Sequence, residues 1–370
     1  LGARLTALTR DLALIPSTVG RPEDRARCVQ LIHNHIESVP DVRIDHHESN
    51  GYTSLTAMPT SVTQPDVLFC GHLDVIEHPD AASYKSSIRD GRIYGPGVGD
   101  MKGAIAIMLE LFRSMQHQHP GLSLGLAITS DEEQGGADGV RYLFEDVGLR
   151  CGVAIVPDGG SINGLTVEEK GVLHLRIRAS GQAAHAARPW FGDNALEHLL
   201  DRLTGVRRYF ANRLTDDMTK STDHWYPTCT VTVVKTDNST VNRIPSSAEA
   251  VLDVRFPPPD TVAGLLKTIR ELLGESITCE SLIAAEPTHF SPDPLYCEVT
   301  EQITGQPINR IRASGGSDAR FIRAAGIPVI LSRPAVGNLH AEDEWIDLDS
   351  MVTYYRICER YVGRKLGRVN

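Results

Sequence analysis

The chain shows two different patterns of apolar and polar positions. In the first part, short apolar runs at 66–75, 122–130 and 151–160 predict buried strands, and the almost wholly apolar segment 103–115 predicts a buried helix. Strands that alternate with helices are typical of an α/β domain with a largely parallel sheet. We therefore expect such a domain over residues 1–170.

From Gly171 onward, apolar and polar residues alternate, which predicts strands with one solvent-exposed face. The predicted helices between them are amphipathic. The predicted order is strand, helix, strand, strand, helix, strand, over 171–181, 194–210, 228–235, 248–256, 261–274 and 276–283. This is the order of a ferredoxin-like α+β unit. We predict that this unit, residues 171–284, is inserted into the α/β domain, which resumes over 285–370.

Composition then narrows the class of protein. The chain is 41% hydrophobic and 23% charged, which is ordinary for a globular protein. Its net charge of −10 argues against a nucleic-acid partner, since binding to phosphates requires a basic surface. No run is long and apolar enough for a membrane helix or the core of a signal peptide. We therefore expect a small-molecule partner and no membrane.

The seven cysteines occur singly, with no CxxC pair, and their number is odd. Several lie in apolar runs, such as Cys70 in VLFCGH. This pattern favours reduced core residues over a disulfide framework. We expect a reducing compartment, the cytoplasm.

Residue types that bind metals follow the apolar runs of the first domain and recur once near the C-terminus. They are His72 and Asp74 in GHLDV, Asp100 in YGPGVGDMKG, Glu132 and Glu133 in TSDEEQGG, Asp158 in IVPDGG, and His340 in GNLHAEDEW. Ligands of open α/β sheets bind beyond the carboxyl ends of the strands, so we expect these side chains to gather there.

Histidines with carboxylates suit zinc, or manganese or cobalt. Five such ligands are too many for one catalytic zinc with an open position, and they suit two ions that share a bridging carboxylate. Each motif taken alone has a structural interpretation as well. Asp100 could cap the helix that follows, Asp158 could belong to a turn, and Asp131 with its two neighbours could be a solvated helix start.

The motifs in their order resemble a known family over nearly the whole chain. They are GHLDV, YGPGVGDMKG, TSDEEQGG, GQAAHAARP, NRIP, DVRF, GGSDARF and the late His340. The chain is similar to the metal-dependent deacylase and exopeptidase family of succinyl-diaminopimelate desuccinylase, acetylornithine deacetylase, aminoacylase and carboxypeptidase G. The resemblance implies a catalytic domain of the zinc-exopeptidase type, and an inserted domain that forms the contact of a homodimer.

The resemblance also implies the metal ligands. His72 and Asp158 would bind one ion, Glu133 and His340 would bind the other, and Asp100 would bridge the two. Two divalent cations would make the cluster of negative charge favourable.

Further roles follow from the same resemblance. Asp74 would accept a hydrogen bond from His72 and orient its ring. Glu132 would be the general base of amide hydrolysis, and Asp131 would cap or pack. His185 would stabilise the oxyanion of the tetrahedral intermediate, working in the active site of the other subunit of the dimer.

Arg255 lies on the same face of its predicted strand as Asp253, so it could simply pair with that carboxylate. The resemblance implies instead that Arg255 clamps the free carboxylate of the substrate. Asn242, Gly316 and Ser317 would supply further substrate contacts.

Three positions depart from particular branches of the family. Asp158 stands where desuccinylases and carboxypeptidase G usually carry Glu, Pro96 where many members have Arg, and Asp343 where desuccinylases have Asn. The expected function is hydrolysis of an N-acyl amino acid. The alternatives are a dipeptidase or exopeptidase on the same machinery, and a non-catalytic binding dimer.

Overall fold

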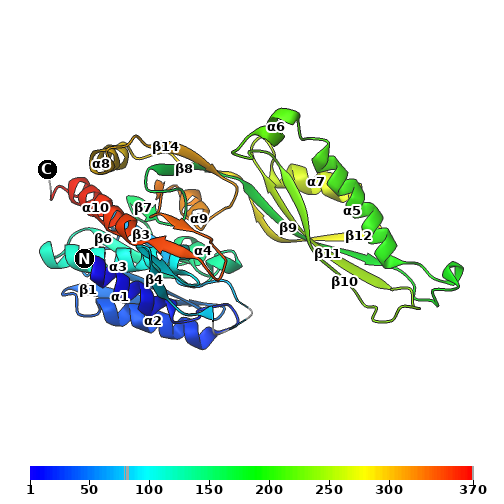
Figure 1. Cartoon of the computed structure of the whole chain (residues 1–370), viewed down its shortest axis with the longest axis horizontal. Coiled ribbons are helices and arrows are strands. Elements are labelled where there is room, and N and C mark those ends of the chain that lie inside the picture. Colours follow the sequence, from blue (N-terminus) through cyan, green and yellow to red (C-terminus); the bar gives the residue numbers. More distant parts are fainter. Residues whose placement is uncertain (79, 81–82, 369–370) are drawn as a thin grey trace. The chain divides into compact units, whose positions relative to one another are not determined.

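The computed structural model describes residues 1–78, 80 and 83–368, and the chain divides into two compact units (Figure 1). The large unit comprises Leu1–Val167, Phe290–Ile311 and Ser317–Asn370. The inserted unit comprises Glu168–His289 and Arg312–Gly316. Relative to the limits expected from the sequence, the inserted unit is longer at both ends and also includes the short segment 312–316.

A six-stranded sheet forms the centre of the large unit. Its spatial order is β1 (Val42–Ser49), β2 (Tyr52–Pro59), β6 (Leu124–Thr129), β3 (Val67–His72), β7 (Val153–Val156) and β15 (Val329–Leu331). The last four strands run parallel, whereas β1, β2 and β6 pair antiparallel. The prediction of an α/β fold with a largely parallel sheet is confirmed.

Both faces of this sheet are covered by helices. Successive side chains of a strand point to opposite sides, so apolar strands offer an apolar surface on each face. In β3, Phe69 packs into one core and Leu68 and Cys70 pack into another. The helices of the large unit are α1 (Gly2–Ala13), α2 (Pro22–Ile36), α3 (Gly103–Gln118), α4 (Val140–Glu145), α8 (Pro294–Thr304), α9 (Ala319–Ala324) and α10 (Leu348–Lys365). Helix α3 is buried along most of its length, as its apolar sequence predicts.

Two smaller sheets contain strands that the sequence pattern did not reveal, since most are only two or three residues long. One has the order β16 (Val336–Gly337), β17 (Trp345–Asp347), β5 (Arg92–Tyr94) and β4 (Ser87–Arg89). The other consists of β13 (Thr288–His289), β8 (Gly164–Glu169) and β14 (Asn309–Ala313), through which the chain passes between the units.

The inserted unit has the ferredoxin-like order predicted from its sequence. Its antiparallel sheet runs β10 (Thr228–Thr236), β11 (Ser247–Phe256), β9 (Gly171–Ser180), β12 (Ile277–Ala285). Helices α5 (Ala195–Ala211) and α7 (Val262–Leu273) pack on the apolar face, and a short helix, α6 (Asp216–Lys220), precedes β10. The other face carries the polar residues of the alternation, including His174, Asp253 and Arg255.

All seven cysteines are free thiols, and Cys28, Cys70 and Cys358 are buried. Among the described residues, no helix combines the length and the apolar character needed to cross a bilayer.

Candidate metal centre

The predicted metal ligands lie at the carboxyl edge of the central sheet. His72 is the last residue of β3, Asp158 follows the end of β7 by two residues, and Glu133 lies in the short 3-10 helix η3 (Glu132–Gln134) after β6. Because β6, β3 and β7 are adjacent and parallel, their ends meet at one place. Asp100, in η2 (Val98–Lys102), and His340, in the turn between β16 and β17, complete the set.

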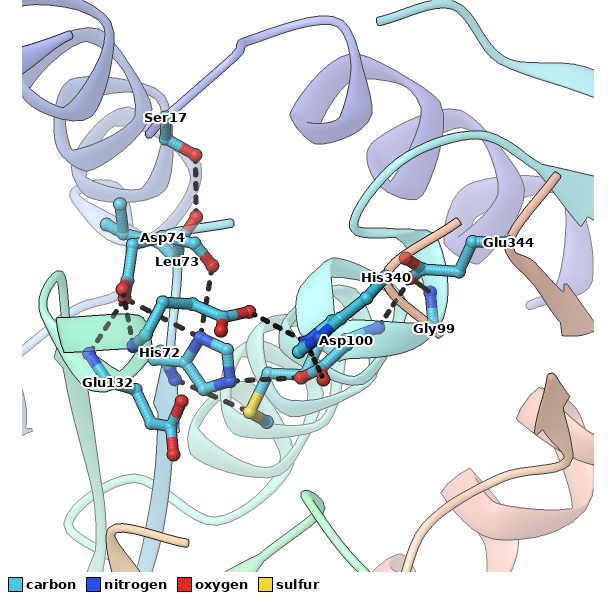
Figure 2. A network of polar contacts seen from close by, with 11 residues as sticks. Ser17, His72, Leu73, Asp74, Gly99, Asp100, Glu132, His340 and Glu344 are labelled. Carbon is cyan, nitrogen blue, oxygen red and sulfur yellow. Dashed lines mark hydrogen bonds and ion pairs between the residues drawn. The ribbon is translucent and has the colours of Figure 1, made fainter. Parts of the chain in front are cut away.

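The ligand atoms form two groups that share Asp100. The atoms of His72, Asp100 and Asp158 lie within 4.8 Å of one another, and so do those of Asp100, Glu133 and His340. Figure 2 shows His72 and His340 on different sides of the Asp100 carboxylate. His72 Nε2 is 3.1 Å from Asp100 Oδ1, and His340 Nε2 is 3.4 Å from Asp100 Oδ2. A carboxylate that presents one oxygen to each group is suited to bridging two cations.

The sequence left open whether Asp100 and Asp158 serve only in capping and turns. Helix α3 starts from Lys102 without a side-chain cap, so Asp100 does not cap it. The Asp100 carboxylate is instead turned to the two histidines.

Acids and histidines lie close together in the cluster, and they change one another's pKa values. Burial alone would lower the pKa of His72, but the neighbouring carboxylates of Asp100 and Asp74 raise it well above its usual value. Burial and the nearby Asp100 raise the pKa of Asp158 to about 7. Hydrogen bonds to Asp100 and Glu133 raise the pKa of His340 to about 10. Imidazole nitrogens and carboxylate oxygens, in two groups that share Asp100, form a donor set that fits divalent cations.

Asp74 has a wider role than the one predicted for it. The acceptor nearest His72 Nδ1 is the backbone oxygen of Asp74, at 3.1 Å, while the Asp74 carboxylate lies at 3.5 Å. That carboxylate accepts the backbone N–H groups of Glu132 at 3.2 Å and Glu133 at 2.9 Å. Asp74 is 2% exposed, so these charge-assisted bonds are shielded from water. It thus holds the backbone of both glutamates, and Figure 2 shows its carboxylate beside Glu132.

The loop that carries the two glutamates is also held by Arg320. Arg320 donates to the backbone oxygens of Gly135 at 2.7 Å and Ser317 at 2.9 Å. Asp131 Oδ2 accepts the N–H of Asp138 at 2.7 Å, which closes a contact within the loop. Burial raises the pKa of Asp131 to about 6. Arg320 was not anticipated from the sequence, because its bonds go to backbone oxygens that no motif reveals.

Gly136, in the same loop, has a φ of +66°. A Cβ there would collide with the carboxylate of the buried Asp318. Both features require glycine, which explains the second glycine of TSDEEQGG.

Glu132 differs from Glu133 in its surroundings. Its carboxylate belongs to neither ligand group and has no hydrogen bond within the described part of the chain. Burial raises the pKa of Glu132 well above its usual value, and Asp158 adds to the effect, against the opposing influence of His72. A carboxyl group whose pKa burial raises, and that lies beside the ligand groups, has the properties of a general acid and base.

The structure places the other predicted site residues in two separate parts of the inserted unit and at its border. Asn242 O accepts the N–H of Ala186 at 2.8 Å, next to His185, which pairs with Arg243. His185 and Asn242 therefore lie together, beyond the ends of β9 and β11 where Ser180 pairs with Ser247.

Arg255 lies at the opposite end of β11, where it pairs with Val172. Its Nε and Nη2 atoms donate to the two oxygens of Asp253, at 2.7 and 3.0 Å. The contact with Asp253 that the sequence allowed is thus present. Gly316 belongs to the inserted unit, and the buried Ser317 begins the next segment of the large unit.

Comparison with known proteins identifies the family. Residues 68–364 match the family described as peptidase family M20/M25/M40. The chain belongs to this family. The prediction of a metal-dependent deacylase and exopeptidase family is confirmed, and with it the prediction of a metal-dependent hydrolase of C–N amide bonds.

Curated relatives of this M20 family member include two desuccinylases. The succinyl-diaminopimelate desuccinylase of Parvibaculum lavamentivorans is 32% identical over 306 residues, which cover 76% of this chain and 75% of the relative. The enzyme of the same name from Acidiphilium cryptum is 29% identical over 322 residues, covering 82% and 83%.

Solved structures show the same fold at lower identity. An M20 family metallo-carboxypeptidase from Sulfolobus solfataricus has a TM-score of 0.78 and 17% identity, covering 98% of this chain and 99% of that one. Human carnosine dipeptidase 1 has a TM-score of 0.76 and 14% identity, covering 99% and 96%.

Proposed function

We propose that this M20 family member is a dinuclear-metal hydrolase that cleaves the amide bond of an N-acyl amino acid. The observation that carries the proposal is the pair of three-residue ligand groups that share Asp100, with the unligated Glu132 beside them. The 32% identity to a desuccinylase supports an acyl group as the part removed.

His72 and Asp158 would hold one ion, Glu133 and His340 the other, and Asp100 both. Imidazole with carboxylates favours Zn²⁺, with Co²⁺ or Mn²⁺ as alternatives. When bound, the ions would make a shared water acidic and polarise the scissile carbonyl.

The remaining chemistry falls to the side chains. Glu132 would take a proton from the attacking water and return it to the leaving amine. Burial raises the pKa of its carboxyl group well above the usual value, which favours the step in which it holds the proton. Asp74 would keep the Glu132 carboxylate positioned for this proton transfer, because it anchors the Glu132 backbone.

The substrate would carry a free carboxylate. Arg255 would bind this carboxylate through Nη1, the guanidinium nitrogen that does not bond to Asp253. The two bonds to Asp253 would fix the plane of the Arg255 guanidinium. Ser317 and Gly316 would contribute polar contacts, and Arg320 would hold the loop they form.

His185 and Asn242 would act together, since they occupy one end of the inserted unit, whereas every proposed metal ligand lies in the large unit. We propose a homodimer in which this pair enters the site of the other subunit, where His185 stabilises the oxyanion. The free thiols favour a reducing location such as the cytoplasm.

The test is a substrate panel assayed with the zinc-loaded protein. N-acetyl and N-succinyl amino acids should be hydrolysed, and dipeptides should be poor substrates. Glu132→Gln should keep its metal and lose at least about 10³-fold in kcat, because only the proton transfer is removed. Preference for dipeptides would support the exopeptidase alternative. No turnover of either class would support the binding dimer.

A further inference from the structure

Glu344 is a buried acid next to the proposed metal centre to which no chemistry has been assigned. It lies four residues after His340 in GNLHAEDEW and is 2% exposed. Its Oε1 atom accepts the backbone N–H of Gly99 at 2.6 Å and that of Asp100 at 2.8 Å (Figure 2). One carboxylate oxygen thus satisfies two backbone donors of the segment that carries Asp100.

The main chain of Glu344 contacts the same segment. Gly95 N–H donates to the backbone oxygen of Glu344 at 2.9 Å. Gly99 is packed against this turn so closely that a Cβ would lie 3.0 Å from Leu339 and 3.2 Å from Glu344 Oε1. A side chain at position 99 would therefore press on the contact between the two segments.

His340 has little else to fix its position. Its side chain is 50% exposed, and among the described residues its ion-pair partners are Asp100 and Glu133. Its backbone has a φ of +65°, a left-handed conformation that a residue with a side chain keeps only when its surroundings impose it. The turn that imposes it runs from Asn338 to Glu344, closed by Ala341 N–H to Asn338 O and Glu344 N–H to Ala341 O, both at 3.1 Å.

We propose that Glu344 is a positioning residue that ties the His340 turn to the Asp100 backbone, so that the two ligands are held at a fixed spacing before metal binds. This inference rests on the proposed function in one respect, namely that Asp100 and His340 are metal ligands. Since Asp100 belongs to both ligand groups, loss of the tie weakens the binding of both ions.

The experiment is calorimetric titration of the metal-free protein with Zn²⁺, without substrate. Glu344→Ala leaves the Gly99 and Asp100 N–H groups without their acceptor, and the Zn²⁺ dissociation constants should rise about 10- to 100-fold. Glu344→Gln keeps an amide oxygen that accepts both bonds, so it should stay within about threefold of the unaltered protein.

The matched control is Glu110, which is also 2% exposed and bonds to Arg4 of α1, His35 of α2 and Arg113 of its own helix, none of them a proposed ligand. Glu110→Ala should lower the unfolding temperature of the metal-free protein without changing Zn²⁺ affinity. If Glu344→Ala fails to fold, Glu344→Asp replaces it, because a side chain one methylene shorter cannot reach both donors and should lose affinity similarly.

Unaltered Zn²⁺ affinity in Glu344→Ala or Glu344→Asp would overturn the proposal. So would an equal loss in Glu344→Gln, which would make charge the cause, or an equal loss in Glu110→Ala, which would make general stability the cause. If the unaltered protein itself bound no Zn²⁺, the proposed function would fail together with this premise, a result that is distinct from all of these.

Discussion

Replacing Asp74 by Asn is the sharpest perturbation of the geometry that holds the proposed base. The two residues have the same size, but the amide offers one acceptor oxygen where the carboxylate offers two. Asp74 receives the N–H groups of both Glu132 and Glu133, so Asp74→Asn leaves one of these donors facing an NH₂ group.

The size of the effect follows from that lost bond. A hydrogen bond to a charged group contributes about 1.5–3 kcal/mol. If the loss falls on the placement of Glu132 in the transition state, kcat drops about 10- to 150-fold, since each 1.36 kcal/mol is tenfold. The five proposed ligands remain in this variant, and the assay is run at saturating Zn²⁺, so that the sites stay filled even if the lost bond to the Glu133 backbone lowers zinc affinity.

The assay compares kcat on an N-acyl amino acid for Asp74→Asn and for Glu110→Gln, with zinc measured by elemental analysis. Glu110→Gln loses charge at an equally buried site without a contact to the glutamate loop, so its kcat should stay within about twofold. If Asp74→Asn keeps full kcat with its metals bound, Asp74 does not position the base and the reasoning fails.

Three further predictions test other parts of the molecule. Arg255→Ala should raise KM at least about tenfold for substrates with a free carboxylate and much less for the matching amides, as steady-state kinetics will show. Mixing Glu132→Gln and His185→Ala chains under subunit exchange should restore activity, because one site of each mixed dimer has both residues. Burial would raise the pKa of Glu110, but hydrogen bonds from His35 and Arg4 lower it to about 2. The ion pairs of Glu110 should therefore stabilise the metal-free protein by about 3 kcal/mol above pH 4.5, and this contribution should be lost as the pH falls towards 2. In Glu110→Gln the contribution should be absent at every pH, which urea unfolding will measure.

Each of these has a clear contrary result. An equal KM change for acids and amides would leave Arg255 as the structural partner of Asp253. Inactive mixed dimers, shown to form by differently tagged chains, would mean that His185 serves its own subunit. A difference between Glu110→Gln and the unaltered protein that persists at pH 2 would mean that the ion pairs of Glu110 are not its cause.

The sequence predicted the parts of the fold that depend on periodicity. The alternation in 171–181 and 248–256 predicted strands with one wet face, and the structure has them as β9 and β11. The two-residue β16 and three-residue β5 are too short to show a period, so the sheet that supports the His340 turn was missed.

The same distinction holds at the site. Side chains that would bind a metal are recognisable by type and by their place after a strand, as with His72. Residues whose side chains bond to the backbone cannot be recognised in this way. Glu344, Arg320 and the carboxylate of Asp74 bond to N–H or C=O groups, which every residue carries, and only the folded chain shows which ones they meet.

The central claim is that two metal ions, held by ligands that share Asp100, support amide hydrolysis. The most direct measurement is a titration of chelated, metal-free protein with Zn²⁺, in which bound zinc per chain and the rate of N-acyl amino acid hydrolysis are followed together. The account predicts no activity before zinc is added, and full activity as binding saturates at two ions per chain. Full activity at zero zinc, or saturation of binding at a single ion, would contradict it.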